Sequence, residues 1–251
     1  MSEPRPGPRC YARGVRALLL SGTFALGACV PEAGNHESQA GAQPASARPD
    51  APASAERDAN AAEFPVSRGG QELVGSRAQP LSPDLRWLSH PIESLESLRG
   101  EVVLVRFWTD ACPFCEASAP GLMRLHERYA DEGLVVIGVF HPKPRGELID
   151  IDALTRRAAE LGLSIPIAID RHWSTLDSWW LRRGQGPRRA TSTSFLIDAE
   201  GRVRWIHPGP EFHPDGPADH DLCRRDFADA ERAVELLLAE RARPRPMATG
   251  T

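Results

Sequence analysis

The sequence predicts an α/β fold in which a mixed central sheet is flanked by helices. Short apolar runs rich in β-branched residues, at 101–108 and 134–140, are typical of buried central strands. Between them, Leu122, Leu125 and Tyr129 follow the spacing of one helical face. A strand, a helix and a second strand in this order form a right-handed crossover with parallel strands.

Further elements extend this sheet toward the C-terminus. We expect a helix over 152–162 and a strand at 165–169. A capping box at 174–177 predicts the start of another helix. The two apolar runs within 194–206 flank a turn and predict an antiparallel hairpin, which makes the sheet mixed. A closing helix is predicted around 227–237.

Composition limits the number of domains and the kinds of partner. The chain has 251 residues, of which 41% are hydrophobic and 25% charged, and this suits one domain with tails. Its 23 prolines indicate that part of the chain is linker. The formal net charge of -4 is small and unclustered, so we expect no nucleic-acid partner.

The N-terminus has the pattern of an export signal. Arginines between Arg5 and Arg16 precede an uncharged run over 17–30, which is too short for a membrane span of about 20 residues. The run ends in Leu26-Gly27-Ala28-Cys29, which resembles a bacterial lipobox. We therefore expect residues 1–28 to be a lipoprotein signal peptide and Cys29 to be lipidated. The alternative is ordinary secretory cleavage that leaves Cys29 as a thiol. Both place the protein outside the cytoplasm, where disulfides persist.

A low-complexity segment follows the signal. Residues 31–63 hold alanine, proline, serine and charged residues but no large apolar side chain, so they cannot bury enough surface to offset the entropy of ordering. We expect a disordered tether over 29–75, one domain over 76–241 and a disordered tail over 242–251. The tether would hold the domain clear of a bacterial membrane on its periplasmic side.

The motif Cys112-Pro113-Phe114-Cys115 lies where the first strand passes into its helix. Unpaired N–H groups at a helix start stabilise a thiolate, which makes Cys112 the expected nucleophile. Pro113 fits the first helical turn because its missing N–H would have no partner there. Cys115 lies one turn deeper on the same side and is the expected resolving thiol. Half of a zinc site and a structural bridge are the alternatives for such a motif.

Several motifs together resemble a known family. Phe107-Trp108 before the CPFC motif, Pro120 after it and the stretch SFLIDAEG at 194–201 are similar to the TlpA/ResA type of extracytoplasmic thiol-disulfide oxidoreductase, which carries a redoxin domain. The resemblance covers about residues 75–240 and implies a thioredoxin-like fold. It also implies dithiol exchange with protein disulfides, often with electrons from a membrane donor. Trp108, Pro113 and Phe114 are then the neighbours of the thiol pair.

The sequence departs from the family pattern at the position of a cis-proline that faces the cysteines. Ser192 stands there. A cis bond before a residue other than proline costs about 3 kcal/mol, so we expect Thr191-Ser192 to be trans and the loop that guides substrate pairing to be reshaped.

Two further departures remove the usual proton acceptors. Arg106 stands where many thioredoxins have a buried aspartate, and Ser118 where the ResA-like pattern has a glutamate. Asp110 or Glu116 could substitute as a base, although each also fits an exposed charge near a helix start. Arg106 either approaches the thiolates and makes the disulfide more oxidising, or extends its charged end to the sheet edge.

A second group of chemical interest follows the hairpin. The loop 207–221 is rich in proline and glycine and carries His207, His213 and His220, and Cys223 comes just after it. Cys223 and one histidine could complete a Cys₃His metal set with the CPFC cysteines. The alternatives are surface histidines beside a half-buried thiol, or Cys223 as an extra disulfide partner for Cys112.

The leading functional interpretation is a membrane-tethered thiol-disulfide oxidoreductase with no cofactor beyond a redox-active Cys112–Cys115 disulfide and with no bound metal. We expect protein disulfides as substrates, reduction as the direction and a membrane protein as electron donor. The main alternative is an extracytoplasmic copper chaperone that uses the same cysteines as ligands. A thiol peroxidase fits less well because Val105 occupies a position where that pattern has proline, and a non-enzymatic adaptor is a further alternative.

Overall fold

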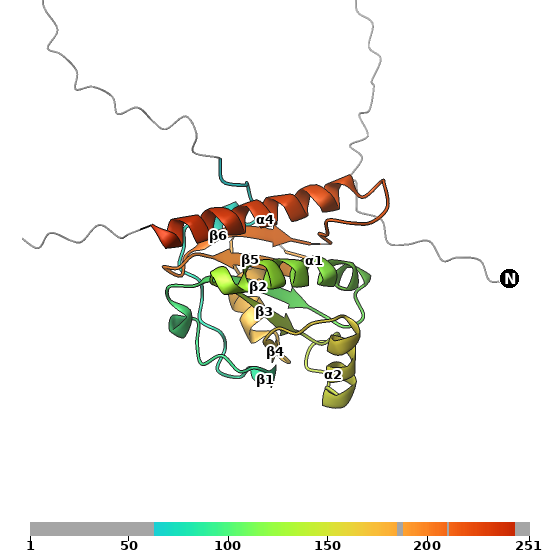
Figure 1. The fold of residues 1–251 in the computed structure, drawn as a ribbon. Helices are drawn as coiled ribbons and strands as arrows, with labels where there is room; N and C mark the ends of the chain where they lie inside the picture. The colour runs from blue at the N-terminus through green and yellow to red at the C-terminus, as the bar shows by residue number, and fades with distance from the viewer. Residues whose placement is uncertain (1–62, 185–187, 210, 244–251) are drawn as a thin grey trace, which may run out of the picture. The chain divides into compact units, whose positions relative to one another are not determined.

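A six-stranded mixed sheet forms the centre of the fold (Figure 1). The computed structural model describes residues 63–184, 188–209 and 211–243. The spatial order of the strands is β1-β4-β3-β2-β5-β6, where β2 pairs with β3 and β3 with β4 in parallel, and the other pairs are antiparallel. The strands are β1 (Arg86–Ser89), β2 (Val102–Trp108), β3 (Leu134–Phe140), β4 (Ile167–Ile169), β5 (Thr193–Ile197) and β6 (Val203–Pro208).

The first crossover matches the prediction. All residues of β2 are buried, and each pairs in parallel with a residue of β3, from Val102 opposite Leu134 to Trp108 opposite Phe140. Helix α1 (Pro113–Tyr129) connects the two strands. The hairpin of β5 and β6 is antiparallel, as predicted, and it brings Ser194 of β5 opposite Arg106 of β2.

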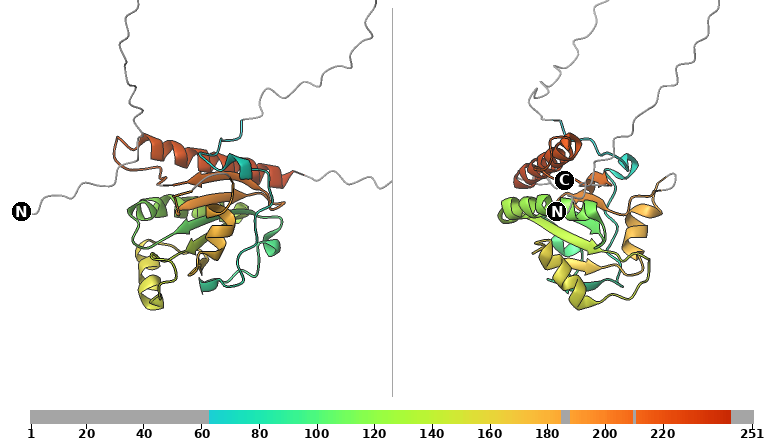
Figure 2. Two further views of the ribbon diagram at one scale, coloured as in Figure 1. Left: turned by 180° about the vertical axis from the view of Figure 1, so that it is seen from behind. Right: turned by 90° about the vertical axis from the view of Figure 1, so that its right-hand side faces the viewer.

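Helices cover both faces of the sheet, as the edge-on view in Figure 2 shows. Helices α1, α2 (Ile151–Glu160) and α4 (Asp221–Ala242) share one apolar cluster with alternate residues of β2. The short helix α3 (Ser174–Leu176) and the π-helical segment η4 (Asp177–Leu181) share the other cluster. The central strands are therefore buried on both sides, which explains their continuous apolar sequences.

Two expectations about local structure need correction. Ser174 does not cap a helix; instead, Trp173 precedes α3 with a φ of 60°, and the Asp170 carboxylate accepts the N–H of Leu176 at 2.9 Å. The capping-box spacing is therefore present without the capping bond. Strand β1, a short edge strand that pairs with β4, was not predicted.

Residues 63–75, which we assigned to the tether, contact the domain. The Ser67 hydroxyl accepts the N–H of Ile206 at 2.9 Å, the Gly75 N–H donates to the carbonyl of Val203 at 2.7 Å, and Leu73 is buried. The expected signal peptide, Cys29, the rest of the tether and residues 244–251 lie outside the described residues. Within the described part of the chain, no helix is both long and apolar enough to cross a membrane.

The aromatic cluster around Phe195 provides a test of this packing. Its ring makes edge contacts with Phe107, Trp179 and Trp180 at centroid distances of 6.1, 5.3 and 6.0 Å. Phe195→Ala should lower the free energy of unfolding by about 3–5 kcal/mol, measured by urea titration, because it leaves a cavity in the core. Val66→Ala should change it little, since Val66 is 69% exposed. A loss below about 1 kcal/mol for Phe195→Ala would contradict this packing.

Candidate redox site

The two cysteines of the CPFC motif occupy unequal positions at the start of α1. Cys112 is the N-cap residue, with Pro113 in the first turn, and its sulfur accepts the N–H of Cys115 at 3.4 Å. Cys112 is partly exposed, whereas Cys115 is buried, and both are free thiols. The exposed sulfur is therefore the one that a large substrate can reach.

This arrangement shifts the pKa values of the two thiols in opposite directions. A hydrogen bond from the Cys115 thiol, aided by the N–H groups of Cys115 and Phe114, lowers the pKa of Cys112 to about 5 against the opposing effect of burial. The pKa of Cys115 is raised, first because its thiol donates to Cys112 and then because it is buried. At neutral pH the site therefore presents a Cys112 thiolate beside a protonated Cys115.

Ser192 faces both sulfurs. Its hydroxyl oxygen lies 3.0 Å from the sulfur of Cys115 and 3.7 Å from that of Cys112. Among the described residues the only cis peptide bond precedes Pro144, so the Thr191-Ser192 bond is trans, as expected. Thr191 is also buried, and the Ser192 carbonyl accepts the N–H of Gly209 at 2.9 Å. A hydroxyl thus stands beside the thiol pair at the position where the resembled family has a proline ring.

Arg106 lies inside the protein, next to Cys115. Its side chain is 2% exposed, its Nη1 donates to the Ser194 hydroxyl at 3.2 Å, and its guanidinium lies 5.4 Å from the ring centroid of Phe212. Burial lowers the pKa of Arg106, while the charges of Cys115 and Cys112 and a hydrogen bond with Cys115 oppose the shift. The alternative in which this arginine extends to the sheet edge is wrong, because the side chain ends among buried groups.

The remaining predicted neighbours differ in their closeness to the sulfurs. Trp108 is buried and packs edge-on against Phe140, and it lines a small cavity together with Cys115 and Arg106. Pro113 is exposed and Phe114 half-buried.

The two candidate bases contact groups other than the thiols. Asp110 accepts hydrogen bonds from Thr109 and from the N–H of Ala111, and Glu116 pairs with Arg157 at 2.8 Å. Both carboxylates are exposed charges near the start of α1, which is the alternative that we gave for each.

The histidine loop is arranged differently from the expectation. His207, His213 and His220 are buried, not on the surface, and Nε2 of His207 lies 2.9 Å from Oδ2 of Asp226. Within the described residues, the only group of three or more candidate metal ligands combines Glu211, His213, His220 and Cys223, and it includes neither Cys112 nor Cys115. The alternative of a Cys₃His set with the CPFC cysteines is therefore not assembled among these residues. Cys112 is a free thiol and Cys223 is disulfide-bonded, so the proposed pairing of these two is not formed.

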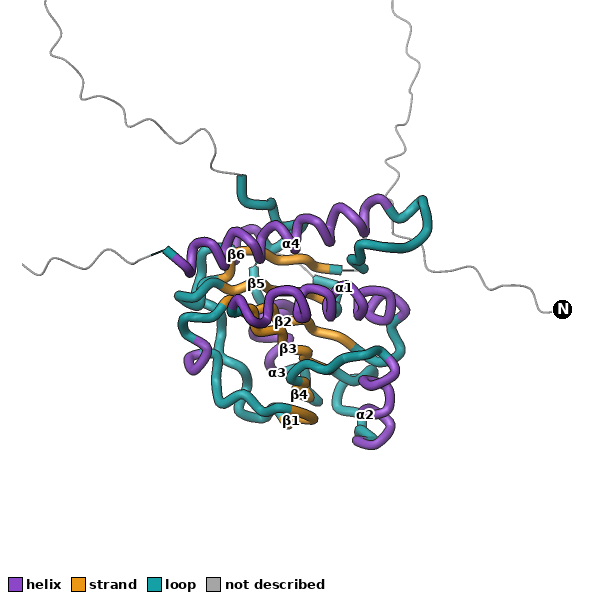
Figure 3. The backbone as a smooth tube through the Cα atoms, in the orientation of Figure 1, coloured by secondary structure: helices purple, strands orange, loops and turns teal. Residues whose placement is uncertain are grey.

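Glu211 was missed by the sequence analysis. It stands in the proline-rich loop between β6 and α4, which Figure 3 shows above the start of α1. Burial raises its pKa, which His220 and His213 lower and Cys112 raises further. Nothing in its local sequence distinguishes it from a solvated loop carboxylate, because it is placed by contacts with His220 and with Cys223 of α4.

A partly exposed thiolate and a buried thiol at the start of a helix, on a mixed sheet flanked by helices, define the thioredoxin-like class of redox proteins. The Redoxin family model matches residues 82–222, and the chain belongs to this family. The expected class, a thioredoxin-like oxidoreductase, is thereby confirmed.

Named relatives agree with this assignment. The protein DipZ of Mycobacterium bovis is 35% identical over 177 residues, which are 68% of this chain but only 23% of DipZ. The thiol-disulfide oxidoreductase ResA of Halalkalibacterium halodurans is 30% identical over 148 residues, covering 59% of this chain and 73% of ResA. The chain therefore spans about a quarter of DipZ and most of ResA.

One solved structure supports the fold, and a second has a lower TM-score. A hypothetical protein from Sinorhizobium meliloti superposes with a TM-score of 0.51 at 20% identity, over 66% of this chain and 85% of that one. A putative thiol:disulfide interchange protein DsbE from Chlorobium tepidum has a TM-score of 0.46 at 22% identity, over 63% and 97% of the two chains.

The asymmetry of the thiols can be tested by alkylation. The rate at which iodoacetamide modifies Cys112 should rise through a midpoint near pH 5, because only the thiolate reacts. Ser192→Ala removes a donor that stabilises this thiolate, so the midpoint should move to higher pH. Ser178→Ala, on the exposed side of η4, serves as the control. An unchanged midpoint in Ser192→Ala would show that the hydroxyl does not act on Cys112.

Arg106 should influence the reduction potential. Its charge stabilises thiolates, which exist only in the reduced form, so Arg106→Met should make the potential more negative and the disulfide less oxidising. Equilibration with glutathione measures the shift. Arg106→Lys keeps the charge and should stay closer to the wild type, while the exposed Arg86→Met should have no effect. Equal potentials in folded Arg106→Met and wild type would leave this arginine with a packing role only.

Proposed function

We propose that this chain exchanges disulfides with protein substrates outside the cytoplasm through Cys112 and Cys115, in the direction of substrate reduction. The observation that carries the proposal is the partly exposed sulfur of Cys112, whose pKa is lowered to about 5 by the hydrogen bonds at the start of α1. A thiolate is the attacking species in disulfide exchange, and this one is formed at neutral pH. The buried Cys115 lies next to Cys112 and can resolve the mixed disulfide.

The reaction takes two displacements. The Cys112 thiolate attacks one sulfur of the substrate disulfide, so that a mixed disulfide forms and the other substrate sulfur leaves as a thiolate, which takes a proton from water. Cys115 then loses its proton to solvent and attacks the sulfur of Cys112. This step forms the Cys112–Cys115 disulfide and releases the second substrate thiolate. The substrate gains two electrons, and the protein supplies them by forming its own disulfide.

Polar groups assist the second displacement. Cys115 must ionise although burial disfavours its thiolate, and the charge of Arg106 lowers its pKa in opposition to that effect. The hydroxyl of Ser192 is in contact with the same sulfur at 3.0 Å. These two groups stabilise the second thiolate.

The cellular setting of the proposal depends on the N-terminal sequence. The lipobox-like segment that ends at Cys29 supports a lipid anchor on the periplasmic side of a bacterial membrane. A membrane protein with a redox-active dithiol would then supply the electrons that reduce the Cys112–Cys115 disulfide after each cycle. The name of the ResA relative supports thiol-disulfide chemistry.

An insulin-reduction assay with dithiothreitol tests the proposed activity. The purified protein should accelerate the precipitation of insulin chains, and Cys112→Ser should abolish the acceleration because the remaining thiol, Cys115, is buried. In a parallel incubation without dithiothreitol, the reduced Cys115→Ser variant should accumulate a mixed disulfide with insulin that is visible on a non-reducing gel, since the resolving thiol is missing. Protein alkylated at Cys112 near pH 6 provides a matched control.

Two outcomes would contradict the proposal. Equal turnover by Cys112→Ser and wild type would remove Cys112 from the reaction. Failure of a folded wild type with an intact thiol pair to reduce insulin or a disulfide-bonded envelope extract would favour the adaptor alternative.

A further inference from the structure

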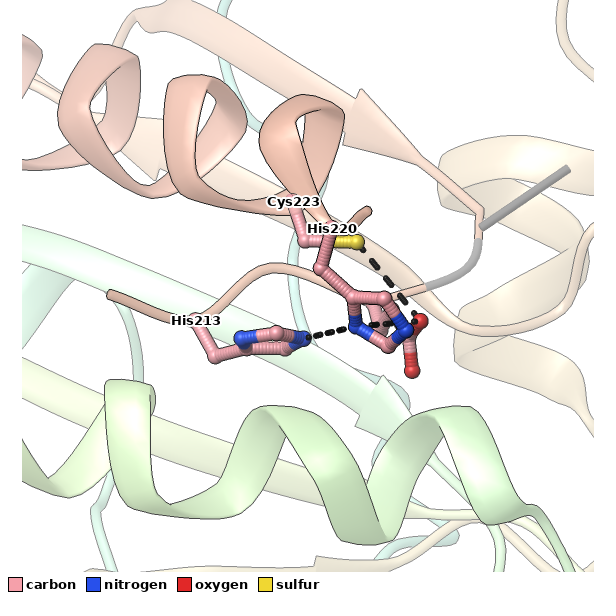
Figure 4. Close-up of side chains that lie close together, drawn as sticks. His213, His220 and Cys223 are labelled. Carbon is pink, nitrogen blue, oxygen red and sulfur yellow. Dashed lines mark hydrogen bonds and ion pairs between the residues drawn. The ribbon is translucent and has the colours of Figure 1, made fainter. Parts of the chain in front are cut away.

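Three polar side chains outside the thiol pair converge inside the loop that joins β6 to α4. Glu211, His213 and His220 are 1%, 7% and 6% exposed, and one ligand atom from each lies within 4.8 Å of the others (Figure 4). Oε1 of Glu211 is 3.7 Å from Nδ1 of His220, and Nε2 of His213 is 3.2 Å from the same nitrogen. The sulfur of Cys223 lies 3.6 Å from the Glu211 carboxylate.

The tautomer of the neutral His213 ring follows from the contact of its other nitrogen. Nδ1 of His213 is in contact with the backbone carbonyl of Asp215, which can only accept, so Nδ1 carries the hydrogen. Nε2 of the neutral ring therefore presents its lone pair to the cluster. Metal-ligating histidines generally donate their second nitrogen to a carbonyl or carboxylate in this way, which fixes the ring and its tautomer.

Two acceptors thus converge on a single nitrogen of His220. The lone pair of His213 and the carboxylate of Glu211 both face Nδ1 of His220, which carries at most one hydrogen when the ring is neutral. One hydrogen cannot serve both acceptors well at these distances. A cation among the three side chains would accept a lone pair from each of them.

The backbone around the cluster is fixed by its neighbours. The N–H of Phe212 donates to the Ser118 hydroxyl of α1 at 3.2 Å, and the ring of Phe212 is fully buried. The N–H of His213 donates to the carbonyl of Cys223 at 3.3 Å, and His220 is the N-cap residue of α4. Because these contacts do not involve the three side chains, the ligand atoms are held together by the fold itself.

We propose that Glu211, His213 and His220 form a binding site for one divalent transition-metal ion of the zinc type, with water as its fourth ligand. Bonds of about 2.0–2.2 Å in tetrahedral geometry place ligand atoms roughly 3.2–3.6 Å apart. The separations of Nδ1 of His220 from Nε2 of His213 and from Oε1 of Glu211, 3.2 and 3.7 Å, are close to this range. Two imidazoles and one carboxylate suit zinc, whereas calcium and magnesium prefer sites built from oxygen ligands. Cys223 is disulfide-bonded and is not counted among the ligands.

Zinc binding to the tag-free, purified chain tests this site. Because the CPFC thiols could bind zinc themselves, the measurement uses the Cys112→Ser/Cys115→Ser variant, titrated with Zn²⁺ by calorimetry. We expect one ion per chain and a rise of the thermal unfolding midpoint with zinc, since a ligand that binds the folded state stabilises it. Calcium at the same concentration should produce no rise.

Substitutions of the ligands make the test specific. His213→Gln and Glu211→Gln should each lower the affinity for Zn²⁺ by at least about tenfold, because a three-ligand site then loses one donor. His126→Gln, on α1 and outside the cluster, is the matched control and should bind as the parent does. Circular dichroism without metal verifies that each variant is folded.

Either of two results would overturn the site. One is the absence of zinc binding by the folded double-serine protein. The other is binding of unchanged affinity and stoichiometry in both His213→Gln and Glu211→Gln, which would place the ion elsewhere. Neither result bears on the thiol chemistry, because the insulin assay is read on the wild-type cysteines.

Discussion

The hydrogen bonds that reach the sulfur of Cys112 connect the fold to its chemistry. They exist because α1 begins shortly after β2 ends, with Cys112 as its N-cap residue. The N–H of Cys115 in the first turn is shared between the carbonyl of Cys112 at 3.0 Å and its sulfur at 3.4 Å. Cys115 contributes its own thiol hydrogen from one turn further along. The buried strand β2 on one side and helix α1 on the other hold this geometry.

The buried arginine changes the electrostatics of such a site. A charge inside a protein is costly unless other groups compensate it. Arg106 meets the hydroxyl of Ser194 and the ring of Phe212, and it lies in the field of the two cysteines. Phe212 in turn is held by the hydroxyl of Ser118.

The departures from the family pattern at 106 and 118 therefore belong to one set of contacts. Arginine replaces an acid in β2, and serine replaces an acid in α1. Both contact Phe212 of the loop between β6 and α4, which brings that loop onto the site. The charge of Arg106 and the hydroxyl of Ser192 therefore lie near the sulfur of Cys115 and favour its thiolate. A carboxylate in the same place would oppose the ionisation of this thiol.

The elements and site residues that could be predicted from the sequence are those whose structure is determined by neighbouring residues in the chain. The runs that form β2 and β3 are continuous and apolar because both faces of the sheet are covered, and the CPFC motif marks its own place at a helix start. The failures arise from distant contacts. Asp170 takes the role expected of Ser174, and Ser67 joins a tether-like segment to β6. Glu211 and the three buried histidines could not be placed from sequence, since a proline-rich loop usually lies in solvent.

The position of Ser192 bears on how charge moves during exchange. A proline ring at this place could only pack against the sulfurs, whereas a hydroxyl has one hydrogen to donate and lies within reach of both. Negative charge starts on Cys112 and appears on Cys115 before the second displacement, so a donor that serves both sulfurs stabilises the beginning and the middle of the reaction. The shorter distance is to Cys115, the sulfur whose thiolate is disfavoured by burial. The Ser192 hydroxyl therefore lies closest to the sulfur whose negative charge the protein interior destabilises.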